Sequence, residues 1–219
     1  IFNESVVRQM KILIGTTNPS KVKRFSEMLS GCGVEFCTLN DIDVHEEPSE
    51  CGSTPEDNAA IKAEFYGQFF DKVICNDSGL YFSELPLNDS MQPGLDIRTP
   101  CGCERLDDEA MISYYSKLIN SLGGRVTAFY LDGIAVYNNG KISTFMEDIA
   151  SARAHSFYMT DKPCEKRLEG WPLDSLSLNK QSLTYFAEAG NDVLDAAEQI
   201  ITDDYRVRVV DFLKSALGI

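Results

Sequence analysis

A short apolar run that stops abruptly at a polar turn constrains the fold of this chain most. Residues 11–15 are followed by Thr16-Thr17-Asn18-Pro19-Ser20-Lys21, after which a helical pattern begins. Asn18 suits the N-cap and Pro19 the first helical position, so a buried strand should lead directly into a helix. Backbone N–H groups at a helix start attract anions. Lys21 opposes the helix dipole, which a bound anion explains better than helix stability; the alternative is an ordinary capped turn with a solvated lysine.

A second apolar run, Val73-Ile74-Cys75, also ends at polar residues, Asn76-Asp77-Ser78-Gly79-Leu80. We expect a turn here, with Gly79 allowing a sharp bend. Functional groups in open α/β sheets gather where strands end. The Asp77 carboxylate at such a place suits a metal ligand or a general base. An Asx turn capped by its own side chains is the structural alternative.

An acidic, turn-rich loop at residues 45–52 leads into the next predicted helix. Thr54 and Pro55, followed by two acids, are typical of a capped helix start, and the pattern predicts a helix over 55–70. Glu50 in this loop is either a functional carboxylate or a solvated acid.

Two faces of this helix carry different residues. Asn58 and Lys62 are four residues apart and therefore share one face. Lys62 could also be an ordinary surface lysine. An adjacent apolar stripe, which we expect to pack on a sheet, consists of Ile61, Phe65 and Phe69.

The pattern along the chain predicts an α/β fold with a mixed sheet and a β-rich second lobe. Asn138-Asn139-Gly140 is a strong hairpin signal. Residues 88–103 and 159–177 read as irregular segments. The further elements predicted are strands at 34–39, 126–137 and 141–149, with 157 as an alternative end for the last. Helices are predicted at 20–30, 107–122 and 191–217, the last broken near Thr202.

Length and composition bound the class of protein. The 219 residues suffice for one sizeable domain, which we place at 10–219, with residues 1–9 as an N-terminal extension or processing remnant. No apolar run approaches a membrane span, and residues 1–9 lack the apolar core of a secretory signal. Seven cysteines without paired metal spacing favour free thiols in a reducing cytoplasm.

The formal net charge of −14 argues against a protein that coats a nucleic-acid polymer. It does not exclude a small phosphorylated ligand, because Lys21, Lys23 and Arg24 form a local basic patch. A divalent cation can also bridge acids to phosphates.

Three motif blocks together resemble the inosine triphosphate pyrophosphatase family, from Lys11 to Leu217. The family's Thr-x-Asn-x-x-Lys turn matches residues 16–21, with Thr17 at a usual glycine position. Its Asp-Asp-Ser-Gly-Leu block is similar to residues 76–80, with Asn76 replacing the first acid. A following Pro-Gly and arginine resemble Pro93-Gly94 and Arg98. The block Glu-x-Gly-x-Thr-x-x-x-Asn-Ala-x-x-Lys-Ala is matched by Glu50, Gly52, Thr54, Asn58, Ala59, Lys62 and Ala63.

Departures from the family pattern fall in the second half. The family's Gly-Phe-Gly-Tyr-Asp-Pro loop is only loosely similar to residues 170–175, where Trp171 and Asp174 supply an aromatic ring and an acid. The family's Ser-His-Arg becomes Asp204-Tyr205-Arg206, and the lysine expected before it has no clear counterpart. In the family these parts grip the base and phosphates, so the preferred base is open. Trp171 could instead be a core or interface residue, and Tyr205 and Arg206 ordinary helix-surface residues.

The resemblance implies an elongated mixed β-sheet flanked by helices, with two lobes around a central substrate cleft, and a homodimer. It implies Mg²⁺-dependent hydrolysis of aberrant purine nucleoside triphosphates (ITP, XTP and dITP) to monophosphate and pyrophosphate, with Mn²⁺ as an alternative metal. The implied metal ligands are Glu50, Asp77 and Asn76, and the implied catalytic groups are Asp77, Lys21 and Lys62. The implied substrate contacts are Thr16, Thr17, Asn18, Lys21, Asn58, Lys62, Ser78, Gly79, Arg98, Trp171, Asp174, Tyr205 and Arg206.

Two other functions remain open. One is a nucleotide-binding homologue with weakened catalysis, which Asn76 and the altered base-recognition segments favour. The other is a related pyrophosphatase that acts on modified pyrimidine nucleotides. Partners other than the nucleotide and a second subunit, such as a nucleic-acid polymer or a membrane, are not expected.

Overall fold

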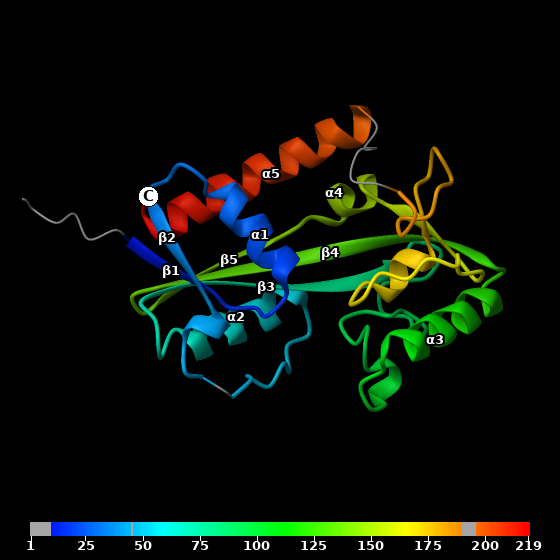
Figure 1. The fold of residues 1–219 in the computed structure, drawn as a ribbon, viewed down its shortest axis with the longest axis horizontal. Helices are drawn as coiled ribbons and strands as arrows, with labels where there is room; N and C mark the ends of the chain where they lie inside the picture. Colours follow the sequence, from blue (N-terminus) through cyan, green and yellow to red (C-terminus); the bar gives the residue numbers. More distant parts are fainter. Residues whose placement is uncertain (1–9, 45, 190–195) are drawn as a thin grey trace, which may run out of the picture. The chain divides into compact units, whose positions relative to one another are not determined.

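The computed structural model describes residues 10–44, 46–189 and 196–219 (Figure 1). The expected extension at 1–9 and the start of the predicted C-terminal helix at 191–195 lie outside the described residues. No described helix has the length and apolar character needed to cross a membrane. The helices and strands are β1 (Met10–Ile14), α1 (Pro19–Met28), β2 (Val34–Thr38), α2 (Pro55–Tyr66), β3 (Lys72–Phe82), α3 (Asp108–Ser121), β4 (Arg125–Asn138), β5 (Lys141–Met146), α4 (Ile149–Ala154), β6 (Phe157–Thr160), β7 (Ser177–Leu178) and α5 (Ala196–Leu217), with 3-10 turns η1 (Leu39–Asp41), η2 (Pro100–Gly102) and η3 (Pro172–Ser175).

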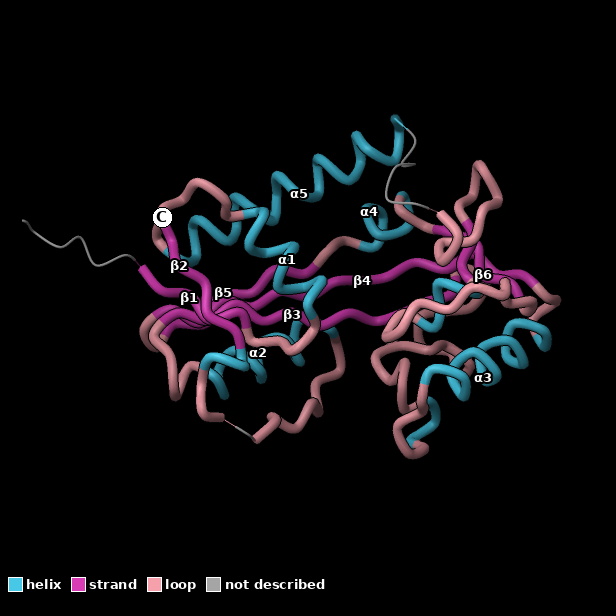
Figure 2. Tube along the Cα trace, in the orientation of Figure 1, coloured by secondary structure: helices cyan, strands magenta, loops and turns pink. Residues whose placement is uncertain are grey.

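The strands form one mixed sheet, which confirms the predicted α/β class. The strand order is β2-β1-β3-β4-β6-β7, with β5 paired to β4 (Figure 2). β1 is parallel to β2 and β3, and α1 and α2 supply the crossovers that parallel pairing needs. β4 is antiparallel to β5 and β6. The predicted hairpin joins β4 to β5, where Asn139 (φ 48°) and Gly140 (φ 89°) adopt the left-handed conformation of a type I′ turn.

The chain divides into two compact units, the first of which comprises residues 1–77, 132–146 and 204–219. In this unit α1 and α5 cover one face of the strands and α2 covers the other (Figure 1). Alternation along β1 explains the two layers: Ile12 and Ile14 pack in the cluster under α1 and α5, whereas Leu13 packs in the cluster under α2. A strand buried on both faces reads as a continuous apolar run, as Ile12, Leu13 and Ile14 do.

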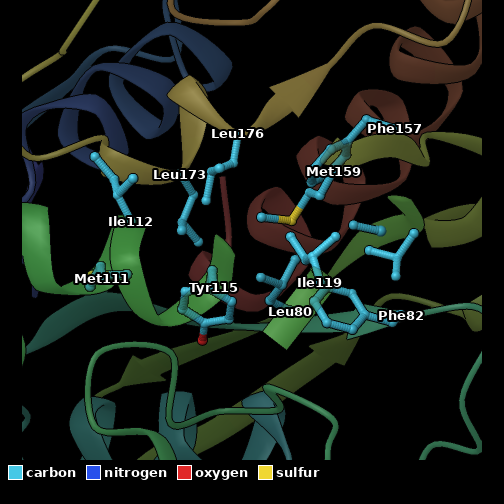
Figure 3. Packing of buried hydrophobic residues seen from close by; sticks show 12 residues of the cluster. Leu80, Phe82, Met111, Ile112, Tyr115, Ile119, Phe157, Met159, Leu173 and Leu176 are labelled. Carbon is cyan, nitrogen blue, oxygen red and sulfur yellow. The ribbon is translucent and has the colours of Figure 1, made fainter. Parts of the chain in front are cut away.

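The second unit comprises residues 78–131 and 147–203 and has its own core. The apolar face of α3 packs there against strands β3 and β6 and the turn η3 (Figure 3). The residues labelled in this core are Leu80, Phe82, Met111, Ile112, Tyr115, Ile119, Phe157, Met159, Leu173 and Leu176. The single domain expected over 10–219 stays a prediction.

The turn predicted at residues 76–80 is wrong, because β3 continues through these residues to Phe82. Beyond Asp77 the strand finds a new partner: the Leu80 N–H donates to the Gly94 carbonyl and the Gly94 N–H donates back, both at 2.9 Å. Gly79 is therefore needed for space rather than for a bend. A Cβ there would lie 2.7 Å from the ring of Tyr81.

The stripe predicted to be buried on α2 is only partly confirmed: Ile61 and Phe65 are half-buried, and Phe65 packs against the cluster under this helix. The buried residues of the helix include Ala59, Ala63 and Tyr66, whereas Phe69 is 53% exposed. Small alanine side chains let the helix lie close to the sheet. A prediction based on large apolar residues does not identify such a face. The helix ends at Tyr66 rather than near residue 70, with Gly67 at its C-cap.

Two further differences concern the second half. The strand predicted to extend beyond Met146 gives way to α4, whose start is capped by Asp148, which accepts a hydrogen bond from the Ser151 N–H at 2.8 Å. The break predicted near Thr202 is absent, and α5 is continuous from Ala196 to Leu217.

Candidate active site

Side-chain hydrogen bonds shape the turn between β1 and α1. The Thr16 hydroxyl accepts from the Asn18 N–H at 3.1 Å, and the Asn18 side chain accepts from the Lys21 N–H at 3.4 Å. Asn18 therefore acts as the predicted N-cap. Two of the amides predicted to bind phosphate, those of Asn18 and Lys21, are engaged by these side chains, while Thr17 is exposed.

Three predicted charged residues of the first unit meet in one cluster, which we call the ion-pair cluster: Glu50, Lys62 and Asp77. The Lys62 ammonium lies 2.9 Å from Glu50 Oε1 and 3.3 Å from Asp77 Oδ1. Lys62 and Asp77 are largely buried, with side-chain exposures of 15% and 14%, whereas Glu50 is 44% exposed. Lys62 is thus not a solvated surface lysine, and Glu50 is not an isolated loop acid.

Asn58 joins the loop before α2 to the carboxylate on β3. Its side chain is buried, donates to Asp77 Oδ2 at 3.0 Å, and accepts from the Gly52 N–H at 2.8 Å. A Cβ on Gly52 would lie 2.7 Å from Asn58 Oδ1, so glycine is needed for this approach. The capping box between Thr54 and Asp57 fixes where the helix starts and therefore where Asn58 lies.

The charges of the ion-pair cluster also act on Lys21, so a second ammonium group belongs to this region. Burial lowers the pKa of Lys21 below its ordinary value, and repulsion from the nearby Lys62 lowers it further. Burial would also lower the pKa of Lys62, but Asp77 and Glu50 together raise it above its ordinary value. Asp77 accepts hydrogen bonds at both oxygens, from the Asn58 amide and from the Lys62 ammonium.

The oxygen donors of this cluster fit a hard divalent cation. Glu50 and Asp77 are carboxylates that already hold a cation, the Lys62 ammonium, between them. Asn76 is buried on β3, and its amide nitrogen lies 3.5 Å from the Asp77 carbonyl oxygen. Side chains alternate along the strand, so Asn76 shares the face of Ile74, whereas Asp77 shares the face of Cys75. Within the described ranges no three His, Cys, Asp or Glu side chains form a metal cluster. Mg²⁺ commonly uses one or two carboxylates plus substrate phosphates, so the two carboxylates suit it.

A second polar cluster in the first unit includes a residue that the sequence analysis missed, Asp132. Asp132 Oδ2 accepts from Arg24 Nη1 at 2.8 Å and from the Tyr205 hydroxyl at 3.1 Å, and Arg24 Nη2 donates to that hydroxyl at 3.0 Å. Burial opposes the charge of Arg24, but Asp132 raises its pKa above the ordinary value. The signal was a lone carboxylate in the otherwise apolar run of β4.

Predicted residues of the second unit form a separate group around residue 170. Arg98 Nη1 lies 3.0 Å from Asp108 Oδ1, and Arg98 Nη2 donates to the Gly170 carbonyl at 3.4 Å. Asp108 also accepts from the Gly170 N–H at 2.8 Å. Trp171 follows and is 46% exposed, so it is not a core residue.

The remaining predicted residues are Asp174, Ser78, Gly79 and Arg206. Asp174 shares the η3 turn with Trp171, and burial raises the pKa of its carboxyl to about 6. Ser78 and Gly79 lie on β3, within the second unit. Arg206 is exposed on α5.

Comparison with known proteins identifies a family model and several curated relatives that this chain resembles. A model of the Ham1 family matches residues 12–156. The dITP/XTP pyrophosphatase of Bacillus subtilis (strain 168) is 38% identical over 113 residues, 51% of this chain and 53% of that protein. The dITP/XTP pyrophosphatase of Oceanobacillus iheyensis is 30% identical over 149 residues, 67% of this chain and 73% of that protein. At the highest identities the chain spans about half the length of the curated relatives that it matches.

The fold is also similar to that of solved structures. The Staphylococcus aureus Ham1 protein aligns with a TM-score of 0.65 over 91% of this chain and 97% of that chain, at 21% sequence identity. At this identity the likeness describes the fold alone.

Proposed function

We propose that this chain, which belongs to the Ham1 family, hydrolyses aberrant purine nucleoside triphosphates such as ITP, XTP and dITP to a monophosphate and pyrophosphate. Family membership confirms the resemblance carried by the three motif blocks. The B. subtilis and O. iheyensis relatives are dITP/XTP pyrophosphatases, which supports the choice of substrates. The observation that carries the proposal is the ion-pair cluster of Glu50, Lys62 and Asp77, with Lys21 close enough to alter its charge balance.

In this proposal the two lysines bind the polyphosphate. Their ammonium groups lie in a partly buried region where water screens charge weakly, so they act strongly on phosphate oxygens. Negative charge shifts between phosphate oxygens as the anhydride bond breaks, and fixed cations stabilise that change. Loss of either lysine should therefore lower turnover more than binding.

Asp77 is the proposed acceptor of the proton from the attacking water. Asn58 and Lys62 hold its two oxygens, so the carboxylate keeps one orientation. Oxygens of Glu50 and Asp77 would hold Mg²⁺, which when bound offsets the charge of the triphosphate, and the family resemblance adds Asn76 as a third ligand. Substitution Asn76→Asp tests the weakest member of this set: unchanged metal dependence would exclude a role for residue 76 in coordination.

A pyrophosphate-release assay tests the proposal. ITP, XTP, dITP and the four ordinary nucleoside triphosphates are compared with Mg²⁺ and with chelator. Turnover of the purine analogues that chelator abolishes is the expected result. Turnover confined to pyrimidine nucleotides would favour the pyrimidine-directed enzyme, and nucleotide binding without turnover would favour the inactive homologue.

A matched pair of lysines on α1 separates a local effect from a general charge effect. Lys21→Met should lower turnover by about 100-fold, the usual cost of removing one transition-state contact. Lys23→Met removes the same charge from a side chain that is 76% exposed and pairs only loosely with Glu27, 3.8 Å away. Equal losses in the two variants would contradict the role of Lys21.

A further inference from the structure

The second polar cluster joins three elements of the first unit through Arg24 of α1, Asp132 of β4 and Tyr205 of α5. Each side chain contacts the other two, at 2.8, 3.0 and 3.1 Å. The cluster is mostly withdrawn from solvent: Tyr205 is 8% exposed, and the Asp132 side chain is 13% exposed. The guanidinium carbon of Arg24 also lies 5.6 Å from the centre of the Tyr205 ring, within cation–π range.

This second polar cluster, called the triad below, lies next to the proposed phosphate site. Arg24 follows Lys21 by three residues, so the two side chains lie on the same side of α1. The charges that act on Lys21 include Lys62 and Asp77 of the ion-pair cluster and Asp132 of the triad. Arg24 is therefore the point at which α1, the helix that carries Lys21, is tied to β4 and α5.

The structure assigns Arg24, Asp132 and Tyr205 as positioning residues that hold α1, and with it Lys21, in place for the polyphosphate. This inference rests on the proposed function. It also reassigns Tyr205, because the family resemblance implies that this position contacts the base. Here the Tyr205 hydroxyl accepts from Arg24 and donates to Asp132, so it serves the phosphate side of the site rather than base recognition.

The chemistry of the triad explains why one hydroxyl matters. Arg24 carries a charge that burial penalises, and its two donors reach two different acceptors. Without the hydroxyl, one guanidinium donor of the partly buried Arg24 loses its acceptor, and Asp132 keeps Arg24 but loses its second donor. A hydrogen bond to a charged, partly buried group is costly to lose. We expect α1 to shift until these groups find water, which displaces Lys21.

Substitution Tyr205→Phe distinguishes positioning from base contact through substrate preference. A positioning role predicts that kcat/KM falls by the same factor, about tenfold, for ITP, XTP, dITP and ATP, as expected when a hydrogen bond to a charged group is lost. The ratios between substrates should stay the same. A change in the ITP-to-ATP ratio would overturn the inference, as would kcat/KM values that equal those of the unmodified protein.

The control is Tyr185→Phe, which removes a hydroxyl that donates to the Lys162 carbonyl at 2.7 Å in the second unit. Its kinetics should match those of the unmodified protein. Asp132→Asn, which weakens the same triad from another element, should reproduce the uniform loss. Thermal unfolding of each variant shows whether the fold is retained; a Tyr205→Phe protein whose kinetic loss only follows unfolding at the assay temperature would overturn the inference.

Calorimetric binding of inorganic tripolyphosphate gives a readout that needs no turnover and no base. Weaker binding by Tyr205→Phe than by Tyr185→Phe supports the inference even if no nucleotide is hydrolysed, a result that would refute only the proposed function. Equal binding by the two variants would overturn the inference while leaving the proposed function intact. Failure of the unmodified protein to bind tripolyphosphate would overturn both.

Discussion

At the scale of single residues, the charge of Lys62 is the central feature of the candidate site. Its ammonium lies between two carboxylates, in the place where a metal ion would neutralise them. In the proposed function, phosphates and carboxylates would therefore compete for one ammonium group. If Lys62 turned to a phosphate, Glu50 and Asp77 would lose their counter-ion and would attract a divalent cation instead.

Substitution Lys62→Met should tighten the binding of Mn²⁺ to the protein without nucleotide. The variant leaves Glu50 and Asp77 as two uncompensated carboxylates, so a divalent cation gains attraction and meets no repulsion from the ammonium. Electron paramagnetic resonance of free Mn²⁺ measures the dissociation constant directly. Lys23→Met, which removes an exposed charge outside the cluster, is the control, and equal Mn²⁺ affinity in the two variants would contradict the prediction.

The buried carboxyl of Asp174 makes stability depend on pH. Its pKa is about 6 in the folded protein, against an ordinary value of 3.8, because burial disfavours the charged form. Between about pH 4 and 6 the unfolded chain loses this proton first, so stability falls as pH rises through that window. Asp174→Asn removes the effect.

Denaturant unfolding at pH 4 and pH 7 checks this prediction. Relative to Asp174→Asn, the unmodified protein should lose about 1 kcal/mol between the two values, less than an unscreened shift implies because part of the carboxyl reaches solvent. Parallel pH curves for the two proteins would contradict it.

At the scale of elements, the sequence predicted what short-range chemistry determines. The capped starts at Asn18 and Thr54, the hairpin at Asn139-Gly140 and the parallel strand–helix–strand units all follow from local signals. The sequence-based prediction failed where the local structure depends on a partner elsewhere in the chain. The polar residues after Cys75 stay in β3 because Gly94 supplies a hydrogen-bond partner for Leu80, and no local sequence pattern predicts that pairing.

In the candidate site, too, local motifs predict some residues, whereas others depend on distant parts of the chain. Glu50, Asn58, Lys62 and Asp77 were identified from motif spacing, and the structure brings them into contact. Asp132 was missed because its partners, Arg24 and Tyr205, lie 108 and 73 residues away in the chain. Side chains that depend on such distant partners need the fold before their surroundings can be known.

The close approach of β4 to the start of α2 gives a prediction at this scale. A Cβ on Gly133 would lie 2.2 Å from the Glu56 nitrogen, so Gly133→Ala must push α2 away from the strand. We expect a loss of about 3 kcal/mol in the free energy of unfolding, as for other overpacked sites. Gly31→Ala is the comparison, since it meets no neighbour within 4 Å and carries only the strain of φ +81°, about 1 kcal/mol. Equal losses in the two variants, measured by denaturant unfolding, would contradict the close approach.

At the scale of the whole molecule, global and local charge oppose each other. The chain carries a formal net charge of −14, which repels polyanions at long range. Lys21 and Lys62 attract phosphate only over a short distance, because salt screens their field within about 8 Å at physiological ionic strength. A small polyphosphate can use that local field, whereas a long nucleic acid must also lie along the acidic surface.

Inhibition experiments distinguish long-range repulsion by the net charge from short-range attraction by Lys21 and Lys62. Inorganic tripolyphosphate should inhibit pyrophosphate release competitively with nucleotide, because it presents the same charges to Lys21 and Lys62. A single-stranded DNA oligonucleotide at the same phosphate concentration should have no effect, since net repulsion from an acidic protein opposes the contacts on which polymer binding depends. Raising the salt concentration should weaken inhibition by tripolyphosphate. Inhibition by DNA equal to that by tripolyphosphate would mean that the acidic surface does not exclude polymers, and that a basic surface other than the two lysines governs access to the site.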